Sequence, residues 1–387
     1  MDRLPPSLSP RAAITAVYFT FGAAIGSMAG SMPTVMRSAG MSSETLGLGL
    51  TVSTISTVAA MSLGGRIARY ASNRAVLLAV LPVFAVSLLA YLMAQSPLWF
   101  FLAVLPMGFC FGLTDLFMNA EAVAMEHDMR RPVFMTFHAA VSAGVALVSV
   151  LASYLSTLLG SWATGGVAVL LFALSWGLVY QTVAPRALAQ GKASRLATLP
   201  NKLPLTLLGI AAGLIIAAET TALLWSAKLL DEQAPALAAI AGLGAAFFGL
   251  CNAAMRFPGD ALRRRLGDMR LLVLSLLVSI AGFIALGLSA SFAGSVAAFA
   301  AVGLGLALLI PCIFSMAAGL VPESRAGALS FVSLLTALPR CAAPGVFGVI
   351  ASGLGISEAF GLVALALTVA LGLIGYFGLR SGRLIIR

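Results

Sequence analysis

The sequence predicts an all-α integral membrane protein with twelve transmembrane helices, and three observations support this class. The 387 residues are 60% hydrophobic and only 9% charged, with a mean hydropathy of +1.04, whereas a soluble domain has about a quarter charged residues. Long apolar runs recur between short polar segments, and a span needs roughly 20 apolar residues to cross a hydrocarbon core of about 30 Å. Positive charges alternate from one connection to the next.

The apolar runs are expected to be helices, because only helices and closed barrels satisfy backbone hydrogen bonds in lipid. They are also too long and too uniformly apolar for barrel strands, which alternate in polarity. In chain order the expected spans cover residues 12–33, 45–65, 75–95, 98–125, 133–159, 163–183, 204–229, 236–256, 270–289, 292–320, 326–353 and 358–379.

The Lys and Arg residues support both the number of spans and their orientation. All 23 of them except Arg37, Lys228 and Arg340 fall on one side of the implied membrane. They lie before span one, in every even-numbered connection, including Arg256 between spans eight and nine, and after span twelve. Because cytoplasmic loops are enriched in Lys and Arg, both termini are expected in the cytoplasm. A misplaced span would disrupt this alternation.

The longest polar stretch divides the chain into two sets of six spans. We expect an N-terminal six-helix bundle at residues 1–183, a cytoplasmic linker at 184–203 and a C-terminal six-helix bundle at 204–387. Two six-helix pseudo-repeats around a site near the membrane midplane are typical of secondary transporters.

Several other functions find no support in the sequence. The net charge of +10 comes from residues scattered over membrane edges, so the positive-inside rule explains it without nucleic acid. The cysteines lack Cys-x-x-Cys spacing and clustered histidines, so neither a metal site nor a disulfide is expected. No Gly-x-x-x-x-Gly-Lys-Ser/Thr loop occurs, so ATP is not the expected energy source. No arrangement of residues indicates an enzyme or a cofactor.

Two loops share a weak repeated signature, one after the second span of each half. The first contains Gly65, Arg69 and Arg74; the second contains Gly259, Asp260, Arg264 and Gly267. With the twelve-span organisation, they resemble the major facilitator superfamily, which has Gly-x-Leu-x-Asp-Arg-x-Gly-Arg at the first position. Arg69 stands where that family has an acidic residue, so the first copy departs from the pattern. The resemblance implies the major facilitator fold and a gating role for both loops.

Further motifs lie in spans four, five, seven, ten and eleven. They are residues 112–120 and 137–144, Glu219 followed by Trp225 and Ser226, Gly303-Leu304-Gly305 and Pro311, and Pro344-Gly345 with Gly348. Together they resemble the fucose-permease-like branch and related bacterial inner-membrane permeases. The resemblance implies uptake of a sugar-like or organic-acid metabolite.

Asp115 is the first candidate for chemistry inside the membrane. An ionisable residue there costs roughly 2.5–3.5 kcal/mol on insertion scales, so each is a functional candidate. At 1.5 Å per residue, Asp115 lies about 16 Å deep, and Asn119 is one turn nearer the cytoplasm on the same face. The sequence offers Asp115 no obvious basic partner. We expect it to carry a proton or to bind substrate; the alternative is a structural hydrogen bond to a neighbouring helix.

Glu219 and Arg340 are expected at one level in the second half, about 22 Å and 21 Å from the cytoplasmic end of their spans. If their faces allow it, they form an ion pair. That pair either stabilises the bundle, or Glu219 exchanges a proton while Arg340 binds an anionic substrate group.

Three further residues are candidates for substrate contact. His138 is expected either to bond Asn119 or Glu121 or to relay protons, and Glu121 itself is expected to reach the membrane interface. Trp225 belongs either to an interfacial aromatic belt or to a platform under a sugar-like ring. Asn252 is a possible hydrogen-bond donor.

Together, these features predict a secondary transporter of the bacterial inner membrane that works by alternating access. Its expected partners are a small-molecule substrate, protons and the lipid bilayer. Asp115 and Glu219 are the expected proton carriers, and the protein is expected to be a monomer. Proton-driven efflux of drugs or toxic metabolites is the alternative to symport. A non-transporting sensor or assembly partner and a lipid flippase are the rivals, and the deep polar residues argue against both.

Overall fold

A computed structural model describes residues 9–129, 134–185 and 202–380. All regular secondary structure in these ranges is helical. Eleven helices or helix pairs there are long and apolar enough to cross a membrane. The one predicted span that is not among these eleven is span eight, which is interrupted between α8 (Leu243–Arg256) and α9 (Gly259–Leu266) as described below. The all-α membrane class is confirmed. The predicted linker lies mostly outside the described residues, as do Arg186, Lys192 and Arg195, so the division at 184–203 stays a prediction.

The first six spans are single helices. Serine side chains cap three of them: Ser9, Ser42 and Ser72 each accept a hydrogen bond from the backbone N–H three residues on, as preferred at helix starts. The helices are α1 (Pro10–Ala39), α2 (Ser43–Ile67), α3 (Asn73–Leu92), α4 (Pro97–Met129), α5 (Phe134–Leu158) and α6 (Ser161–Thr182).

The second half contains two interrupted spans. Its elements are α7 (Lys202–Gln233), the 3₁₀ turn η2 (Pro235–Ile240), α8 (Leu243–Arg256), α9 (Gly259–Leu266), α10 (Asp268–Leu288), α11 (Phe292–Leu306), α12 (Leu309–Leu320), the 3₁₀ turn η3 (Pro322–Ser324), α13 (Arg325–Leu354) and α14 (Ile356–Arg380).

Proline explains both interruptions. Proline has no N–H to bond the carbonyl four residues earlier. Pro258 stands at the break between α8 and α9, and Pro311 follows the break between α11 and α12 by one turn. The prediction that span eight ends at residue 256, in a loop, is therefore wrong. The helix resumes at Gly259 and ends at Leu266, so Arg256 lies at an interior break.

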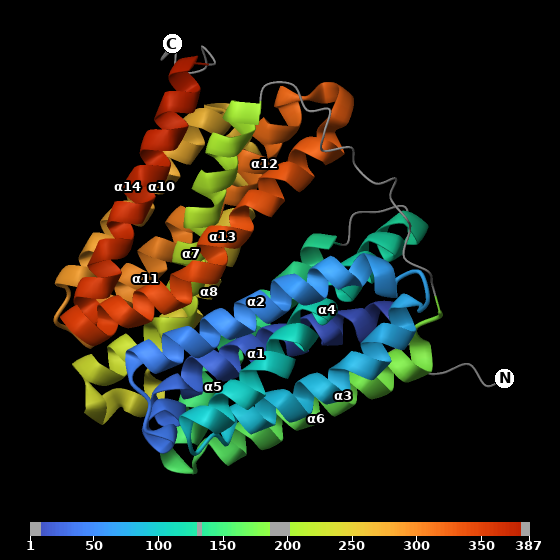
Figure 1. The fold of residues 1–387 in the computed structure, drawn as a ribbon, viewed down its shortest axis with the longest axis vertical. Helices are drawn as coiled ribbons and strands as arrows, with labels where there is room; N and C mark the ends of the chain where they lie inside the picture. Colours follow the sequence, from blue (N-terminus) through green and yellow to red (C-terminus); the bar gives the residue numbers. More distant parts are fainter. Residues whose placement is uncertain (1–8, 130–133, 186–201, 381–387) are drawn as a thin grey trace.

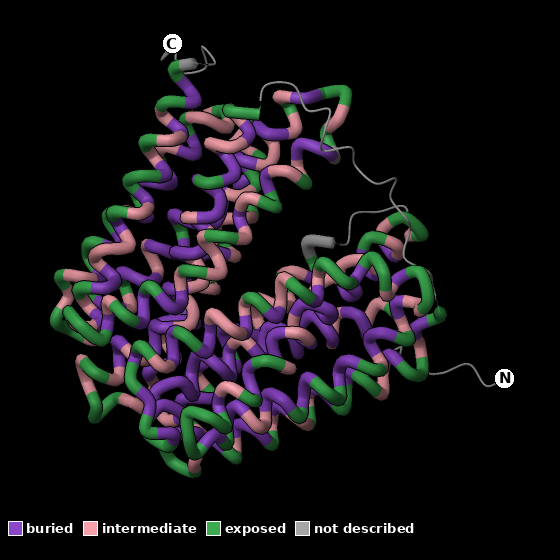
Figure 2. Tube along the Cα trace, in the orientation of Figure 1, coloured by how far each residue is buried: buried purple, intermediate pink, exposed green. Residues whose placement is uncertain are grey.

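The two halves touch at one end and diverge toward the end where α6 finishes and α7 begins (Figure 1). We call the diverging end the linker side and the touching end the far side. At the far side α2 packs against α13, α5 against α8, and α1 against α7. Figure 2 shows buried residues inside each half and partly exposed residues on helix faces that border the divergence.

Direct bonds join the halves at the far side. Arg37 of α1 forms an ion pair with Asp231 of α7 at 2.5 Å. The Gly345 N–H of α13 donates to the Thr51 hydroxyl of α2 at 2.9 Å. Ser153 of α5 accepts from the N–H of Gly242 at 3.0 Å. These contacts close the far side.

Candidate functional site

A chain of hydrogen bonds runs through the first half from α1 to α4. The Tyr18 hydroxyl donates to Asn119 Oδ1 at 2.8 Å. The Asn119 amide nitrogen donates to Asp115 Oδ1 at 2.9 Å and to the Asp115 carbonyl at 2.8 Å. Asp115 and Asn119 share a face because they are four residues apart on α4. The chain fixes the rotamer of Asp115, which the structure leaves partly exposed.

Asp115 faces a positive charge from the other half. The guanidinium of Arg340 on α13 is close enough to interact electrostatically with the Asp115 carboxylate, although no N–O distance between them falls within 4.0 Å. Arg340 is therefore a longer-range countercharge of Asp115 that was not obvious from the sequence, and not an ion-pair partner within 4.0 Å. The sequence could not reveal this countercharge, because it lies on a helix more than two hundred residues away.

Glu219 pairs with Arg256 rather than with Arg340. Arg256 Nη2 lies 3.9 Å from Glu219 Oε1, with side chains 35% and 29% exposed respectively. The expected pairing of Glu219 with Arg340 is therefore not observed. Because α8 ends at Arg256 inside a span, the guanidinium reaches a carboxylate well along α7.

Among the residues that the structure describes, three nitrogen donors in the second half are buried without a hydrogen-bond acceptor. They are the Nε atoms of Arg256 and Arg340 and the Nδ2 atom of Asn252. Asn252 and Arg256 lie four residues apart on α8, so they occupy one face. Buried polar groups are normally hydrogen-bonded, and each exception needs an explanation. These N–H groups can donate hydrogen bonds to the oxygen atoms of a ligand.

His138 lies beside the same cluster. Its ring meets Tyr18 edge-on with 5.4 Å between centroids, and Tyr18 also stacks on Phe137 at 5.3 Å. His138 of α5 is within electrostatic range of Arg256 of α8, so it also faces the other half.

Two neighbouring residues are buried. Glu121 is 1% exposed and accepts a hydrogen bond at 3.0 Å from the side chain of Asn73, the first residue of α3, so it lies near the linker-side end of α3 but is covered by packing. Trp225 is 1% exposed and packs against Phe347 with 4.8 Å between ring centroids. It lies in no exposed belt and offers no free ring face in this conformation. Its apolar ring is buried in the packing of the second half.

The first signature loop lies at the linker side. Gly65 and Arg69 are exposed. The Arg74 guanidinium donates to the carbonyl of Tyr180 at 2.7 Å and lies over its ring at 5.4 Å from the centroid. Arg74 therefore ties the start of α3 to the end of α6, within one half.

The second signature loop is more tightly folded. Gly259 lies against Leu308, which places the two helix breaks side by side. Arg263 lies 3.9 Å from Asp260 and donates from Nε to Asp268 at 2.8 Å. Arg263 therefore ties α9 to the start of α10.

The remaining residues of this loop are exposed. Arg264 points to solvent. Gly267 has a φ of 76° between α9 and α10, a conformation that favours glycine. Gly267 therefore permits the tight turn.

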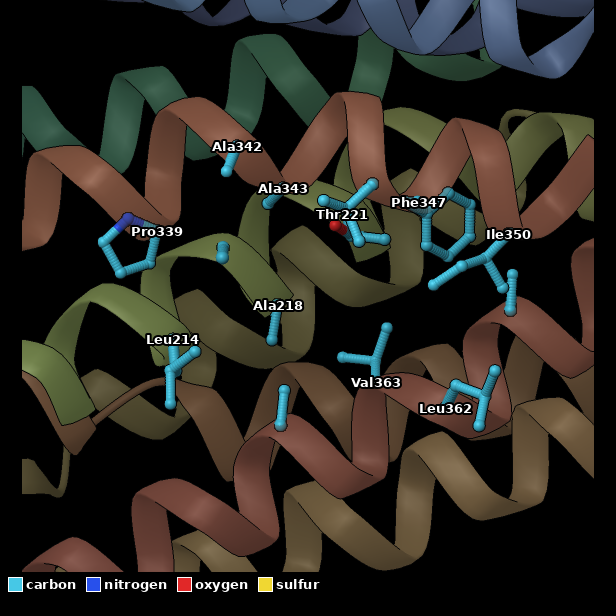
Figure 3. Close-up of a pocket in the computed structure, with 14 residues that line it drawn as sticks. Leu214, Ala218, Thr221, Pro339, Ala342, Ala343, Phe347, Ile350, Leu362 and Val363 are labelled. Carbon is cyan, nitrogen blue, oxygen red and sulfur yellow. The ribbon is translucent and has the colours of Figure 1, made fainter.

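An apolar cavity of about 270 Å³ lies within the second half, among α7, α13 and α14 (Figure 3). Its lining includes Leu214, Pro339, Phe347 and Val363, and Thr221 supplies a hydroxyl. None of the ionisable residues described above lines it. The cavity therefore suits apolar groups, not a polar solute.

Two members of the polar cluster have no clear signal in the sequence. A tyrosine within an apolar span, such as Tyr18, is equally typical of a core ring and of a site residue. Arg256 followed by Phe257-Pro258-Gly259 is typical of a span end, so its place inside the bundle is not predicted. Within the described residues, no group of three or more His, Cys, Asp or Glu side chains could hold a metal ion.

Curated proteins and solved structures match this chain over nearly its whole length. No protein-family model matches it. The chain is 26% identical to the membrane protein MosC of Rhizobium meliloti over 377 residues, which covers 96% of this chain and 91% of MosC. It is also 26% identical to an uncharacterized MFS-type transporter of Yersinia pestis over 386 residues, covering 94% of this chain and 95% of that protein.

Solved transporter structures share the fold. The nucleoside transporter NupG superposes with a TM-score of 0.73 at 14% identity, covering 97% of this chain and 99% of NupG. The Escherichia coli fucose:proton symporter FucP gives a TM-score of 0.60 at 15% identity, covering 95% and 98%. A D-xylose-proton symporter gives 0.76 at 14% identity, covering 94% and 96%.

Proposed function

We propose that this chain, which has the fold of the major facilitator superfamily and resembles its fucose-permease-like branch, is a secondary transporter of a small polar solute. The full-length similarity to an MFS-type transporter and to solute transporters of the same fold supports this proposal. Two six-helix halves that surround a site near the midplane suit alternating access.

One observation carries the proposal: ionisable side chains of both halves face one another inside the spans. Asp115 of α4 faces Arg340 of α13, and His138 of α5 faces Arg256 of α8. Such groups are costly in a membrane and usually mark substrate or proton pathways. A protein that served only as a scaffold would gain nothing from placing them between its halves.

We assign the linker side to the cytoplasm of a bacterial inner membrane. The positive-inside rule supports this orientation. The far side is closed by the Arg37–Asp231 ion pair and the Gly242–Ser153 hydrogen bond. The conformation is then open toward the cytoplasm, and transport requires these far-side contacts to separate. The solute, protons and the bilayer are the partners of a monomer in this account.

Protons are the proposed driving ions, with Asp115 and Glu219 as their carriers. Each carboxylate lies near an arginine without a hydrogen bond to it. A proton on either carboxylate removes a negative charge and frees the nearby guanidinium. Because both arginines belong to the second half, protonation of Asp115 weakens an attraction between the halves. Proton binding is thereby linked to their relative movement.

Proteoliposomes with an enclosed pH-sensitive dye test this function. Pools of sugars, sugar acids, organic acids, nucleosides and cationic drugs are added outside, and the dye reports proton movement. A solute-dependent signal supports a proton-coupled transporter. Radiolabelled uptake of the same pools without a dye signal would support transport and remove proton coupling. No uptake and no signal for any pool, from monodisperse protein, would overturn the proposal.

A further inference from the structure

We infer that the transported solute is a hydroxylated carboxylate of sugar-acid type, with its carboxylate on Arg340 and a hydroxyl on Asp115. This inference rests on the proposed function and names its substrate class. It follows from the complementary hydrogen-bonding groups that the two halves present.

The second half presents donors that have no acceptor. Arg340 makes no hydrogen bond or ion pair with any residue that the structure describes, and its Nε is buried. Arg256 meets Glu219 only at 3.9 Å, beyond hydrogen-bonding distance. Guanidinium groups match carboxylates through two parallel hydrogen bonds. An anionic oxygen ligand would satisfy Arg340. Asn252 and Arg256, four residues apart on α8, offer further donors in the same half.

The first half presents an acceptor instead. Asn119 is occupied, since its oxygen accepts from Tyr18 and its nitrogen donates to Asp115. The Asp115 carboxylate uses Oδ1 for Asn119, which leaves Oδ2 without a partner in the described residues. A solute hydroxyl can donate to this oxygen. The solute therefore needs a hydroxyl toward α4 and a carboxylate toward α13.

Charge favours the same class. Asp115, Glu219, Arg256 and Arg340 sum to zero when all are ionised, and His138 faces Arg256 from the first half. One proton on a carboxylate leaves a single positive charge. A monocarboxylate neutralises it, whereas a cationic solute adds to it. Burying an uncompensated charge is expensive, so an anion that enters with one proton crosses at the lowest electrostatic cost.

A charge series on one sugar skeleton tests the inference. D-glucuronate, D-glucose and D-glucosamine carry a negative, neutral and positive charge on closely similar rings. D-gluconate, D-galacturonate, D-glycerate and D-lactate extend the acids. Binding is measured by thermal stabilisation of the purified full chain in detergent, and transport by uptake into proteoliposomes. We expect at least one hydroxylated acid to bind and to be transported, with its neutral and amino counterparts at least tenfold weaker.

Variants then place the carboxylate. Arg340→Gln should weaken binding of the acid by about ten- to a hundredfold, because a hydrogen bond to a charged group is lost. Arg340→Lys keeps the charge but loses the planar guanidinium that donates two parallel hydrogen bonds. Its affinity for the acid should therefore lie between those of the wild type and Arg340→Gln. Arg265→Gln is the matched control, because it removes the same charge from an exposed position on α9. It should bind like the wild type.

The outcomes separate this inference from the transport proposal. Binding of an acid that is lost in Arg340→Gln and partly kept in Arg340→Lys supports it. Transport of only neutral or cationic compounds overturns the substrate class and leaves the transporter proposal standing. An acid that binds equally well to wild type and folded Arg340→Gln overturns the assigned site. If no acid binds, the inference fails, and the wider solute pools alone decide whether the chain transports.

Discussion

Arg256 of α8 and Glu219 of α7 form a loose ion pair, with 3.9 Å between Nη2 and Oε1 and each side chain about one-third exposed. The pair depends on the helix break at Phe257–Pro258, which stops α8 at Arg256. Glu219 was expected to pair with Arg340 because the two residues lie at similar depths, but it pairs with Arg256 instead. This pairing also leaves Arg340 unbonded within the described residues, opposite Asp115 of the other half.

Removing both partners of this pair should cost less stability than the sum of the two single removals. Glu219→Gln leaves Arg256 without its countercharge, and Arg256→Gln leaves Glu219 uncompensated. The double variant should be more stable than the sum of the single effects, with a coupling of about 1 kcal/mol. Thermal unfolding of the purified variants in detergent measures this. Strictly additive losses would show that the two charges do not interact.

Tyr18→Phe should destabilise the first half, whereas Tyr91→Phe should not. The Tyr18 hydroxyl donates to Asn119, and loss of such a bond costs about 1 kcal/mol. Tyr91 is equally buried, but its hydroxyl has no hydrogen-bond partner among the described residues, so its removal should be neutral or stabilising. Chemical denaturation of both variants measures the difference. Equal losses of stability would contradict the bonding assigned to Tyr18.

A side chain at Gly47 should prevent closure of the far side. A Cβ atom there would lie 2.9 Å from Gly348 Cα of the other half, and still nearer to the Pro344 carbonyl oxygen. Gly47→Leu should therefore separate α2 from α13 and abolish solute uptake. Gly353→Leu is the control on α13, since nothing lies within 4 Å of a Cβ atom at that position.

The rate at which a buried far-side cysteine reacts with a labelling reagent measures this opening. Ser153 is 1% exposed and bonds Gly242 across the halves. Ser153→Cys, in a chain whose four native cysteines are replaced by alanine, should react several-fold faster with an impermeant maleimide when Gly47→Leu is present. Unchanged labelling and normal uptake in Gly47→Leu would contradict the assigned closure.

Reversing the charge of Arg37 should favour the opposite conformation. Arg37→Asp places two carboxylates together at the far side, and like charges repel. Swapping both residues, in Arg37→Asp with Asp231→Arg, should restore the attraction. The rate at which the cysteine of Ser153→Cys is labelled should rise in the single variant. It should fall back to the rate measured with Arg37 and Asp231 intact when both residues are swapped. A swap that labels as fast as the single variant would show that this pair does not hold the far side.

The sequence predicts the spans well because hydrophobic length and positive charge are local properties. Residues 292–320 match the span formed by α11 and α12, and Asp115 lies within its helix as expected. Where a charge ends an apolar run, the same reasoning fails. Arg256 followed by Pro258 is typical of a loop, yet a second helix, α9, begins at Gly259, which lies against Leu308.

Pairing among buried residues was harder to predict. The distance from the membrane edge set Glu219 and Arg340 at one level, but their partners depend on helix rotation and on the other half. Trp225 shows the same limit: an aromatic ring near a span end suits a belt, a platform or a core, and contact with Phe347 selects the core. Tyr18 belongs to the site only because α1 brings it beside Asn119.

The most direct test of the central claim compares two transport modes of Asp115→Asn in proteoliposomes, with a solute that the dye assay identifies. Counterflow requires solute exchange but no net proton movement, whereas accumulation under an imposed pH gradient requires both. Glu323→Gln, at an exposed carboxylate, is the control. We predict that Asp115→Asn retains counterflow and loses gradient-driven accumulation at least tenfold. Wild-type accumulation by Asp115→Asn would contradict the assignment of Asp115 as a proton carrier.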